Sequence, residues 1–391
     1  MSKNLFQQDP PLDNRSGGNY LPRRLLLKRG GQLLGVATAL GLAETLSGCG
    51  SNASADAAAA PDAGITLDQV TNARGTAKII GWQFYHAPEL DTANVKSQWG
   101  YIGGNEDTIT KTAQPGAIDL VTMTNGYDDQ LLAAKRVIPT NPALLSNWEN
   151  INPTFRNWPE ISRNGSVLSI PLQWSYGYMQ WDARFTTEPK SLDDLFSPKL
   201  ARKVGLPDDP YAVITTFARL LGYADPQKLK PNEFQKVVDT LNRFKSQLLT
   251  LHQYGEEPAL LARGDIWVDL PCYASSFLDA RKAGAKMETS LLGSWSYLDC
   301  CTVVRGADIP VALSFINNTL ETGAQAALAT KAWSFPVVDS ALYGVPKELQ
   351  FSSLDAILSK APLQPGVPFD NNSGFVSFPE WIKAWERFKA L

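Results

Sequence analysis

Histidine and cysteine are scarce in this chain, which has 2 histidines and 4 cysteines among its 391 residues. His86 and His252 lie far apart in the sequence and belong to no recognisable metal-ligand pattern, so we expect each to be a solvated or loop residue. The chain also lacks the G-x-S-x-G, Walker and G-x-G-x-x-G motifs of common nucleophilic and nucleotide-binding sites. These absences argue against an enzyme and predict no catalytic residue, no metal and no cofactor.

A strong excess of one charge is also missing. The formal net charge is −3, and no basic stripe stands out beyond the N-terminal region, which argues against a nucleic-acid partner. Hydrophobic residues make up 44% and charged residues 19%, with 26 prolines and 29 glycines, a globular composition with long irregular connections. The length allows roughly two domains, each with a core of its own.

Long apolar runs are lacking too, because the stretch "LLGVATALGLAETL" near the N-terminus is too short for a good membrane-spanning helix. It follows Arg23 and Arg24 and precedes "LSGC", which ends at Cys49. This order resembles a twin-arginine signal peptide over residues 1–48 with Cys49 as the lipidated residue. We therefore expect export to the periplasm and a lipid anchor in the membrane. Residues 50–64 are small, polar and alanine-rich, and we expect residues 49–76 to form a flexible tether, with ordered structure from about Ala77.

Three further cysteines remain, Cys272, Cys300 and Cys301. Neighbouring Cα atoms lie about 3.8 Å apart, less than the roughly 4.4–6.8 Å of a relaxed disulfide, so Cys300 and Cys301 should not bond to each other. On a strand they also point to opposite faces, which argues against a shared metal. Three interpretations stay open: small buried hydrophobic residues, a disulfide from one of them to Cys272, and a redox or metal role.

Short apolar runs alternate with amphipathic segments, which indicates an α/β protein. We expect strands or extended segments at 77–85, 117–123, 169–182, 265–271 and 298–304. We expect helices at 208–223, 234–248 and from Ser377 to the C-terminus, the first with Asp209 as its N-cap. Between 85 and 117 no run is strongly apolar, so a surface helix and loops are expected there.

Aromatic residues recur beside carboxylates in this chain. Aromatic walls around desolvated carboxylates suit an ammonium ligand, since each cation–π contact offers roughly 0.5–2 kcal/mol and a hydrogen-bonded ion pair adds to it. The residues concerned are Trp82, Tyr85, Tyr127, Asp208, Asp209, Tyr273, Tyr297 and Asp299.

Four segments, "GWQFY", "IDLVTMTNGY", "SIPLQWSYGYMQWD" and "EPKSLDDLFSPKLARKVGLPDD", occur in this order between Lys78 and Leu391. In sequence and spacing the chain resembles the spermidine/putrescine-binding proteins of bacterial ABC importers. The last segment is the most specific match. The resemblance implies a two-lobe periplasmic-binding-protein fold of the type II kind, with crossing hinge strands and a ligand cleft between the lobes. The implied lobes comprise 77–180 with 299–345, and 181–298 with 346–391.

The same resemblance implies a lipid-anchored receptor, a monomer, that captures a small cationic solute such as putrescine or spermidine and delivers it to permease subunits. The ligand residues that it implies are Trp82, Tyr85, Thr124, Tyr127, Asp209, Tyr273, Tyr297, Asp299 and Asn371. A glutamate of the family is replaced here by Ala212, and Asp208, Asp269 and Glu288 are candidates to compensate for it.

Three alternatives remain at this stage. The receptor role could serve another solute, namely an amino acid derivative, a peptide, a sugar or a metal complex. An exported hydrolase would require His86 or His252 to lie beside a serine or cysteine. A purely structural surface lipoprotein is the third alternative.

Overall fold

A computed structural model describes residues 64–105, 107–370 and 372–390 of the chain. The predicted signal peptide, Cys49 and most of the predicted tether lie outside the described residues. Ordered structure begins before Ala77, because helix α1 covers Leu67–Thr71 and strand β1 covers Gly75–Gly81. The predicted end of the tether at residue 76 was therefore wrong, since the Thr66 side chain and Gln69 form a capping box that starts α1.

One mixed sheet organises the described residues. Its main path runs β2-β1-β3-β11-β7-β10-β8-β9, with β4 beside β11 and β12 beside β7. The strands are β1 (Gly75–Gly81), β2 (Val95–Tyr101), β3 (Leu120–Thr124), β4 (Val137–Ile138), β7 (Ile170–Asp182), β8 (Val204–Pro207), β9 (Leu248–His252), β10 (Val268–Cys272), β11 (Met287–Val304) and β12 (Phe335–Pro336). A separate hairpin joins β5 (Ser162–Arg163) to β6 (Ser166–Val167). Within each group, β1 to β3 and β8 to β10 pair in parallel.

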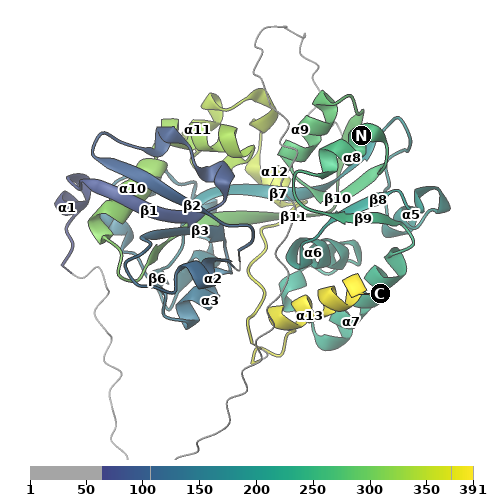
Figure 1. The fold of residues 1–391 in the computed structure, drawn as a ribbon, viewed down its shortest axis with the longest axis horizontal. Helices are drawn as coiled ribbons and strands as arrows, with labels where there is room; N and C mark the ends of the chain where they lie inside the picture. Colours follow the sequence, from purple (N-terminus) through teal and green to yellow (C-terminus); the bar gives the residue numbers. More distant parts are fainter. Residues whose placement is uncertain (1–63, 106, 371, 391) are drawn as a thin grey trace, which may run out of the picture. The chain divides into compact units, whose positions relative to one another are not determined.

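Two long antiparallel strands, β7 and β11, connect these groups. Figure 1 shows them running from the β1–β3 group to the β8–β10 group. The β1–β3 group with its helices forms the first lobe and the β8–β10 group the second lobe. The sequence predicted β11 only from residue 298, but the strand begins at Met287. Its first half was missed because residues 288–293 are only half-buried, so the strand lacks a continuous apolar run there.

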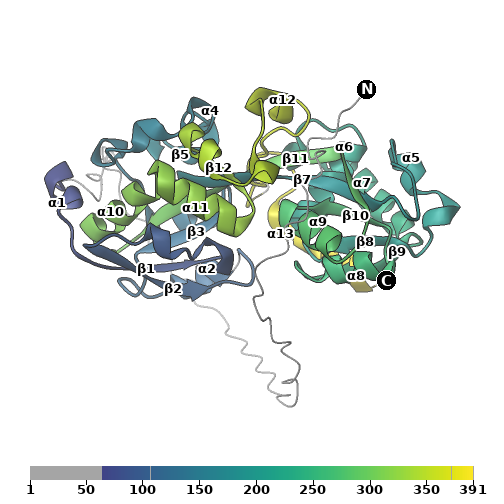
Figure 2. The same cartoon turned by 90° about the horizontal axis from the view of Figure 1, so that it is seen from above.

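Helices cover both faces of the sheet, as Figure 2 shows. They are α1 (Leu67–Thr71), α2 (Asp107–Lys111), α3 (Asp128–Ala133), α4 (Pro153–Arg156), α5 (Leu192–Leu195), α6 (Pro210–Leu220), α7 (Pro231–Phe244), α8 (Glu257–Arg263), α9 (Ala274–Lys282), α10 (Ile309–Thr319), α11 (Thr322–Ala332), α12 (Leu354–Leu358) and α13 (Phe378–Ala390). In the first lobe α10 packs on β1, β2 and β11, and in the second α6 packs on β8, β10 and β11. Helix α13 covers α6 and α7 with the buried faces of Trp381 and Trp385. In the described part of the chain no helix is both long enough and apolar enough to cross a membrane.

Strand β2 is a correction to the sequence analysis, which expected a surface helix and loops between 85 and 117. The strand pairs with β1 at the edge of the sheet, and Val95 is its one fully buried residue. Most residues of this edge strand are exposed, because only one side of it is paired and covered. Its sequence therefore contains few apolar residues in a regular pattern.

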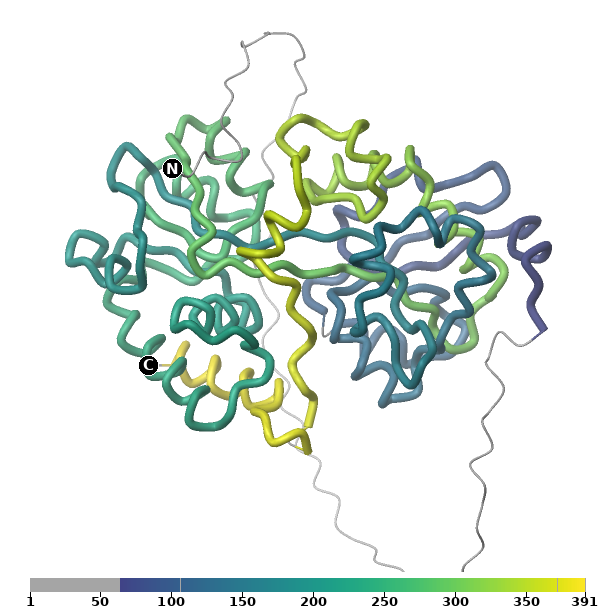
Figure 3. Tube along the Cα trace, turned by 180° about the vertical axis from the view of Figure 1, so that it is seen from behind, coloured from purple at the N-terminus to yellow at the C-terminus, as the bar shows by residue number. Residues whose placement is uncertain are grey.

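A third segment crosses between the lobes after α12, and Figure 3 shows it running between them toward α13. Its backbone is fixed to β11, since the Gln364 N–H donates to the Ser296 carbonyl oxygen at 2.9 Å. At Gly366 the segment touches Gly126 of the β3–α3 turn so closely that a Cβ on Gly126 would lie 2.1 Å from the Gly366 Cα. Two glycines are needed at this crossing, because either added Cβ would enter the other backbone.

Candidate ligand-binding site

The site residues come from the carboxyl ends of parallel strands in the two lobes. Trp82 follows β1, Thr124 ends β3, Asp209 follows β8, and Tyr273 follows β10. In open α/β sheets this edge is where ligands bind, because loops and helix N-termini open outward there. The strands therefore bring together side chains that lie far apart in the sequence.

A cavity of about 260 Å³, which we call the main cavity, lies at these strand ends. Eight of the nine predicted ligand residues line it: Trp82, Tyr85, Thr124, Tyr127, Asp209, Tyr273, Tyr297 and Asp299. The ninth, Asn371, lies outside the described residues. The structure thus brings the predicted set together, and their contact with a ligand stays a prediction.

Asp299 is the more enclosed of the two acidic residues in the predicted ligand set, with 3% of its surface exposed. It lies on β11 opposite Thr124 of β3 and next to an irregularity between Asp299 and Cys300 in the β7 pairing. The Thr124 hydroxyl donates to its Oδ1 at 2.8 Å and the Tyr85 hydroxyl donates to its Oδ2. Burial raises the pKa of Asp299 to about 6, although both hydrogen bonds act to lower it. No lysine, arginine or histidine of the described chain forms an ion pair with this carboxylate, so it lacks a counter-ion.

Asp209 has two tasks in the structure. As predicted, it caps α6, and its Oδ1 accepts the Ala212 N–H at 3.0 Å. Its Oδ2 accepts the Tyr254 hydroxyl at 2.8 Å. Burial raises the pKa of Asp209 while these hydrogen bonds oppose the rise. The capping role is local to α6, and the carboxylate also faces the main cavity.

Aromatic rings form two walls of the main cavity. In the first lobe, Trp82 stacks on Phe84 with ring centroids 5.7 Å apart, and Phe84 meets Tyr85 edge-on at 4.7 Å. In the second lobe a continuous row of contacting rings follows the order Tyr254, Tyr273, Tyr297, Trp295 and Tyr211. Rings presented in this way can contact methylene groups and ammonium groups alike.

The first wall depends on a glycine at the end of β1. A Cβ on Gly81 would lie 1.8 Å from the Thr122 hydroxyl oxygen, so β1 and β3 approach closely at this point. Directly after Gly81 the chain turns into a short 3-10 helix, Gln83–Tyr85, with Trp82 at its start. This turn directs Trp82 and Tyr85 to the main cavity.

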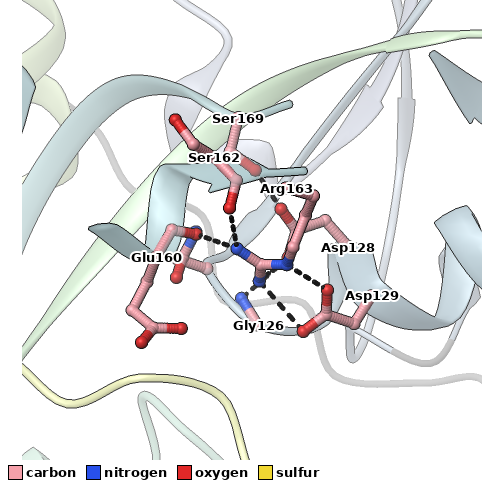
Figure 4. A network of polar contacts seen from close by, with 8 residues as sticks. Gly126, Asp128, Asp129, Glu160, Ser162, Arg163 and Ser169 are labelled. Carbon is pink, nitrogen blue, oxygen red and sulfur yellow. Dashed lines mark hydrogen bonds and ion pairs between the residues drawn. The ribbon is translucent and has the colours of Figure 1, made fainter. Parts of the chain in front are cut away.

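A partly buried polar network holds the β3–α3 turn, which carries Thr124 and Tyr127, and Figure 4 shows it. Asp128 accepts the Gly126 N–H at 2.9 Å and the Ser169 hydroxyl, which ties the turn to the start of β7. Arg163 pairs with Asp129 through Nε at 2.5 Å and also donates to the backbone carbonyls of Glu160 and Ser162. The network fixes the turn from three directions and so positions Thr124 against Asp299.

Several lining residues were missed by the sequence analysis. They are Phe84, Asn105, Tyr211, Tyr254, Gly255, Glu257, Ser275, Trp295, Lys331, Ala332, Trp333 and Ser334. Phe84 lies two residues after Trp82, and Trp295 lies two residues before Tyr297, so both could have been found from the same aromatic pattern. The segment 331–334 follows α11, and its Trp333 ends that helix with φ 49°, a left-handed conformation that bulky residues rarely adopt.

The three candidates to replace the family glutamate at Ala212 do not line the main cavity. Asp208 faces α13, where it accepts the Trp385 Nε1–H at 2.7 Å and pairs with Lys389 at 3.3 Å. Asp208 also lines a second cavity of about 170 Å³, which shares Asp209 with the main cavity. Asp269 is buried and bound to His252. The additional carboxylate in the main cavity is Glu257.

His252 is a further correction, because it is buried rather than solvated. Its Nε2 lies 2.8 Å from Asp269 Oδ1 and its Nδ1 lies 3.6 Å from Glu257 Oε2. These carboxylates raise the pKa of His252 to about 9 in spite of burial, which lowers it. His86 contacts the Tyr101 hydroxyl at 2.8 Å. The described partners of the two histidines include neither a serine nor a cysteine, the pairing that the hydrolase alternative requires.

Cys272, Cys300 and Cys301 are all buried and free, which favours the interpretation as packing residues over the disulfide. Burial raises the pKa of each thiol, so none of them is a reactive thiolate at neutral pH. Among the residues that the structure describes, no group of three histidine, cysteine or acidic side chains could hold a metal ion.

Comparison with known proteins decides the fold. Two solved structures superpose on most of this chain. The Tp0655 (TpPotD) lipoprotein of Treponema pallidum has a TM-score of 0.69 and 16% identity, covering 80% of this chain and 99% of that one. The spermidine/putrescine ABC transporter substrate-binding protein PotD of Streptococcus pneumoniae has a TM-score of 0.67 and 17% identity, covering 81% and 98%. The chain has the two-lobe periplasmic-binding-protein fold.

Sequence comparison finds relatives of the kind that the motifs indicated. The spermidine/putrescine-binding periplasmic protein of Escherichia coli (strain K12) is 28% identical over 187 residues, which are 44% of this chain and 53% of that protein. The chain thus matches about half the length of this curated relative. No family model matches the chain. The predicted α/β two-lobe fold and the resemblance to this kind of periplasmic protein are therefore confirmed.

Proposed function

We propose that this periplasmic-binding-protein fold is a receptor for a small cationic solute, a polyamine such as putrescine or spermidine, which it delivers to the permease of an ABC importer. The receptor acts as a monomer in the periplasm, exported by the twin-arginine route and held to the membrane by a lipid on Cys49. Asp299 and Asp209 neutralise ammonium groups, and Trp82, Tyr85, Tyr273 and Tyr297 enclose the methylene chain.

The observation that carries this proposal is the environment of Asp299. A carboxylate that is 3% exposed, with a pKa of about 6, is ionised at neutral pH and faces the main cavity, and no lysine, arginine or histidine of the described chain forms an ion pair with it. Burying such a charge is costly unless an opposite charge arrives. A protonated amine supplies that charge, and the aromatic rings around it favour a cation over an anion.

Calorimetry on residues 64–391 tests the proposal with putrescine and spermidine as ligands. We expect one amine per protein, and we expect Asp299→Asn to weaken binding about 10-fold to 100-fold, because a hydrogen bond to a charged group contributes about 1.5–3 kcal/mol. Asp355→Asn is the matched control, since this carboxylate is exposed on α12 and does not line the main cavity. Absence of heat with both amines, or equal affinity in Asp299→Asn, would overturn the assignment.

One observation favours a second candidate ligand. Lys331 lines the main cavity beside the three carboxylates, so a solute with both an ammonium and a carboxylate group, such as an amino acid derivative, would find partners for each. Mass spectrometry of the small molecules released from purified protein separates this candidate from a polyamine. Lys331→Gln would weaken the zwitterion and leave or improve the affinity for a polyamine.

A further inference from the structure

We propose that Glu257 is the second ammonium anchor of the main cavity and makes this receptor selective for linear diamines over monoamines. One end of the diamine pairs with Asp299 of β11 and the other with Glu257 at the start of α8. This inference rests on the proposed function, and it names a residue that neither the motifs nor the resemblance singled out.

The placement of Glu257 supports this role. It is 4% exposed, and it lines the main cavity together with Tyr254 and Gly255 of the loop that leads into α8. Its Oε2 accepts the Gly255 N–H at 2.7 Å and lies 3.6 Å from His252 Nδ1. The Oε1 atom of Glu257 accepts no hydrogen bond from another residue of the described chain. A carboxylate oxygen accepts about two hydrogen bonds, so Glu257 keeps capacity for a ligand N–H.

The surrounding charges leave Glu257 in need of a cation. His252 is shared with Asp269, whose Oδ1 is nearer to its ring, at 2.8 Å compared with 3.6 Å for Glu257. One imidazolium therefore faces two carboxylates, and one negative charge is not compensated. Burial and the neighbouring Asp269 raise the pKa of Glu257, in agreement with this imbalance.

The cavity as a whole has the charge that a dication requires. Three carboxylates, Asp209, Glu257 and Asp299, and one lysine, Lys331, line it, an excess of two negative charges when all are ionised. Asp299 belongs to β11 and Glu257 to α8, so the two anchors stand on separate elements rather than on one turn. The row of rings from Tyr254 through Tyr273 to Tyr297 leads from the Glu257 loop to the Asp299 strand. A methylene chain laid along these rings would therefore lead from one carboxylate toward the other.

Calorimetry with putrescine, together with butylamine as a competitor, tests the inference. We expect Glu257→Gln to weaken putrescine about 10-fold to 100-fold and butylamine less than about 3-fold, because the monoamine uses Asp299 alone. Glu256→Gln is the control, since Glu256 is the exposed neighbour of Glu257 and does not line the main cavity. It should leave both affinities unchanged.

A second variant tests the preference for diamine length, which would not change if Glu257 had only a structural role. Glu257→Asp keeps the charge but withdraws the carboxylate by one methylene, so preference should shift from 1,4-diaminobutane toward 1,5-diaminopentane. This variant also carries the test if Glu257→Gln fails to fold. The inference would be overturned if Glu257→Gln left the putrescine affinity unchanged or weakened putrescine and butylamine equally. It would also be overturned if Glu257→Asp did not change the preferred diamine length. The proposed function would stand in each of these cases. If the unaltered protein bound neither amine, the proposed function would fail first.

Discussion

At the level of single residues, Asp299 lowers the stability of the ligand-free folded protein. The carboxylate is buried with two hydroxyl donors and no cation, and its pKa in the folded chain, about 6, lies above the usual value of an aspartate. Ligand-binding sites often keep such unfavourable charges, because the bound ligand compensates for them. The buried charge of Asp299 therefore explains both the loss of stability and the proposed binding of a cation.

The stability of the ligand-free protein should therefore depend on pH through Asp299. A raised folded-state pKa means that the contribution of this group is favourable below about pH 4 and is lost as pH rises through about 6. Asp299→Asn stays neutral, so at pH 7.5 it should increase the free energy of unfolding by about 1–3 kcal/mol. At pH 4.5 the difference from the unaltered protein should shrink toward zero. Urea unfolding at both pH values measures it, and a variant that is less stable at pH 7.5 would contradict this expectation.

The residues of the site were predictable to different degrees. Asp299, Trp82 and Tyr85 were predicted as ligand residues because the resemblance to a known family implies them. Glu257 was missed because its stretch, "YGEEPALL", predicts only a turn followed by a helix start, and nothing local indicates that the first turn faces a cavity. The burial of His252 was missed for a related reason, since Asp269 reaches it from a different strand.

At the scale of elements, the contact between the β3–α3 turn and the C-terminal crossing segment stands out. Gly126 has φ +100°, and its backbone lies against Gly366, so the turn that carries Thr124 and Tyr127 depends on a position without a side chain on either element. The same segment receives the Tyr211 hydroxyl, which donates to the Pro365 carbonyl oxygen at 3.0 Å. The crossing segment therefore joins a site residue of each lobe.

Gly126→Ala should be strongly destabilising for this reason. The left-handed backbone costs an alanine about 1–2 kcal/mol, and the clash with backbone atoms of Gly366 adds about 1–3 kcal/mol. Gly165→Ala is the matched control, because Gly165 also has a positive φ, +79°, but nothing lies within 4 Å of an added Cβ. Gly165→Ala should lose only the about 1–2 kcal/mol that the left-handed backbone costs. Urea unfolding compares the two variants. Equal losses in the free energy of unfolding would show that the contact with Gly366 does not contribute to stability.

The elements that were predicted are those with a strong apolar pattern in the sequence. Strands β7 and β10 and helices α6, α7 and α13 were located because their apolar residues repeat at strand or helix spacing. Strand β2 was missed because most of its residues are exposed, and the first half of β11 because its residues are half-buried. Their extended conformation comes from pairing with neighbouring strands, which no local pattern records.

For the whole molecule, the decisive feature is that two strands and one C-terminal segment connect the lobes. Strand β11 carries Tyr297 and Asp299 at the point where it pairs with both β3 and β7, so the site lies on the connection itself. Hinge closure around a ligand is the usual motion of such two-lobe proteins. The bounds of the lobes at 77–180 with 299–345 and 181–298 with 346–391 remain a prediction. The pairing of β11 with β3, between residues about 175 positions apart, could not be derived from local sequence patterns.

The most direct measurement is a crystal structure of residues 64–391 grown with one equivalent of putrescine. We expect one amine in the main cavity, with one nitrogen within hydrogen-bond distance of the Asp299 carboxylate and the other beside Glu257. The methylene chain should lie against Tyr273 and Tyr297. A main cavity that holds only water under these conditions, or an amine bound solely elsewhere on the protein, would contradict the central claim.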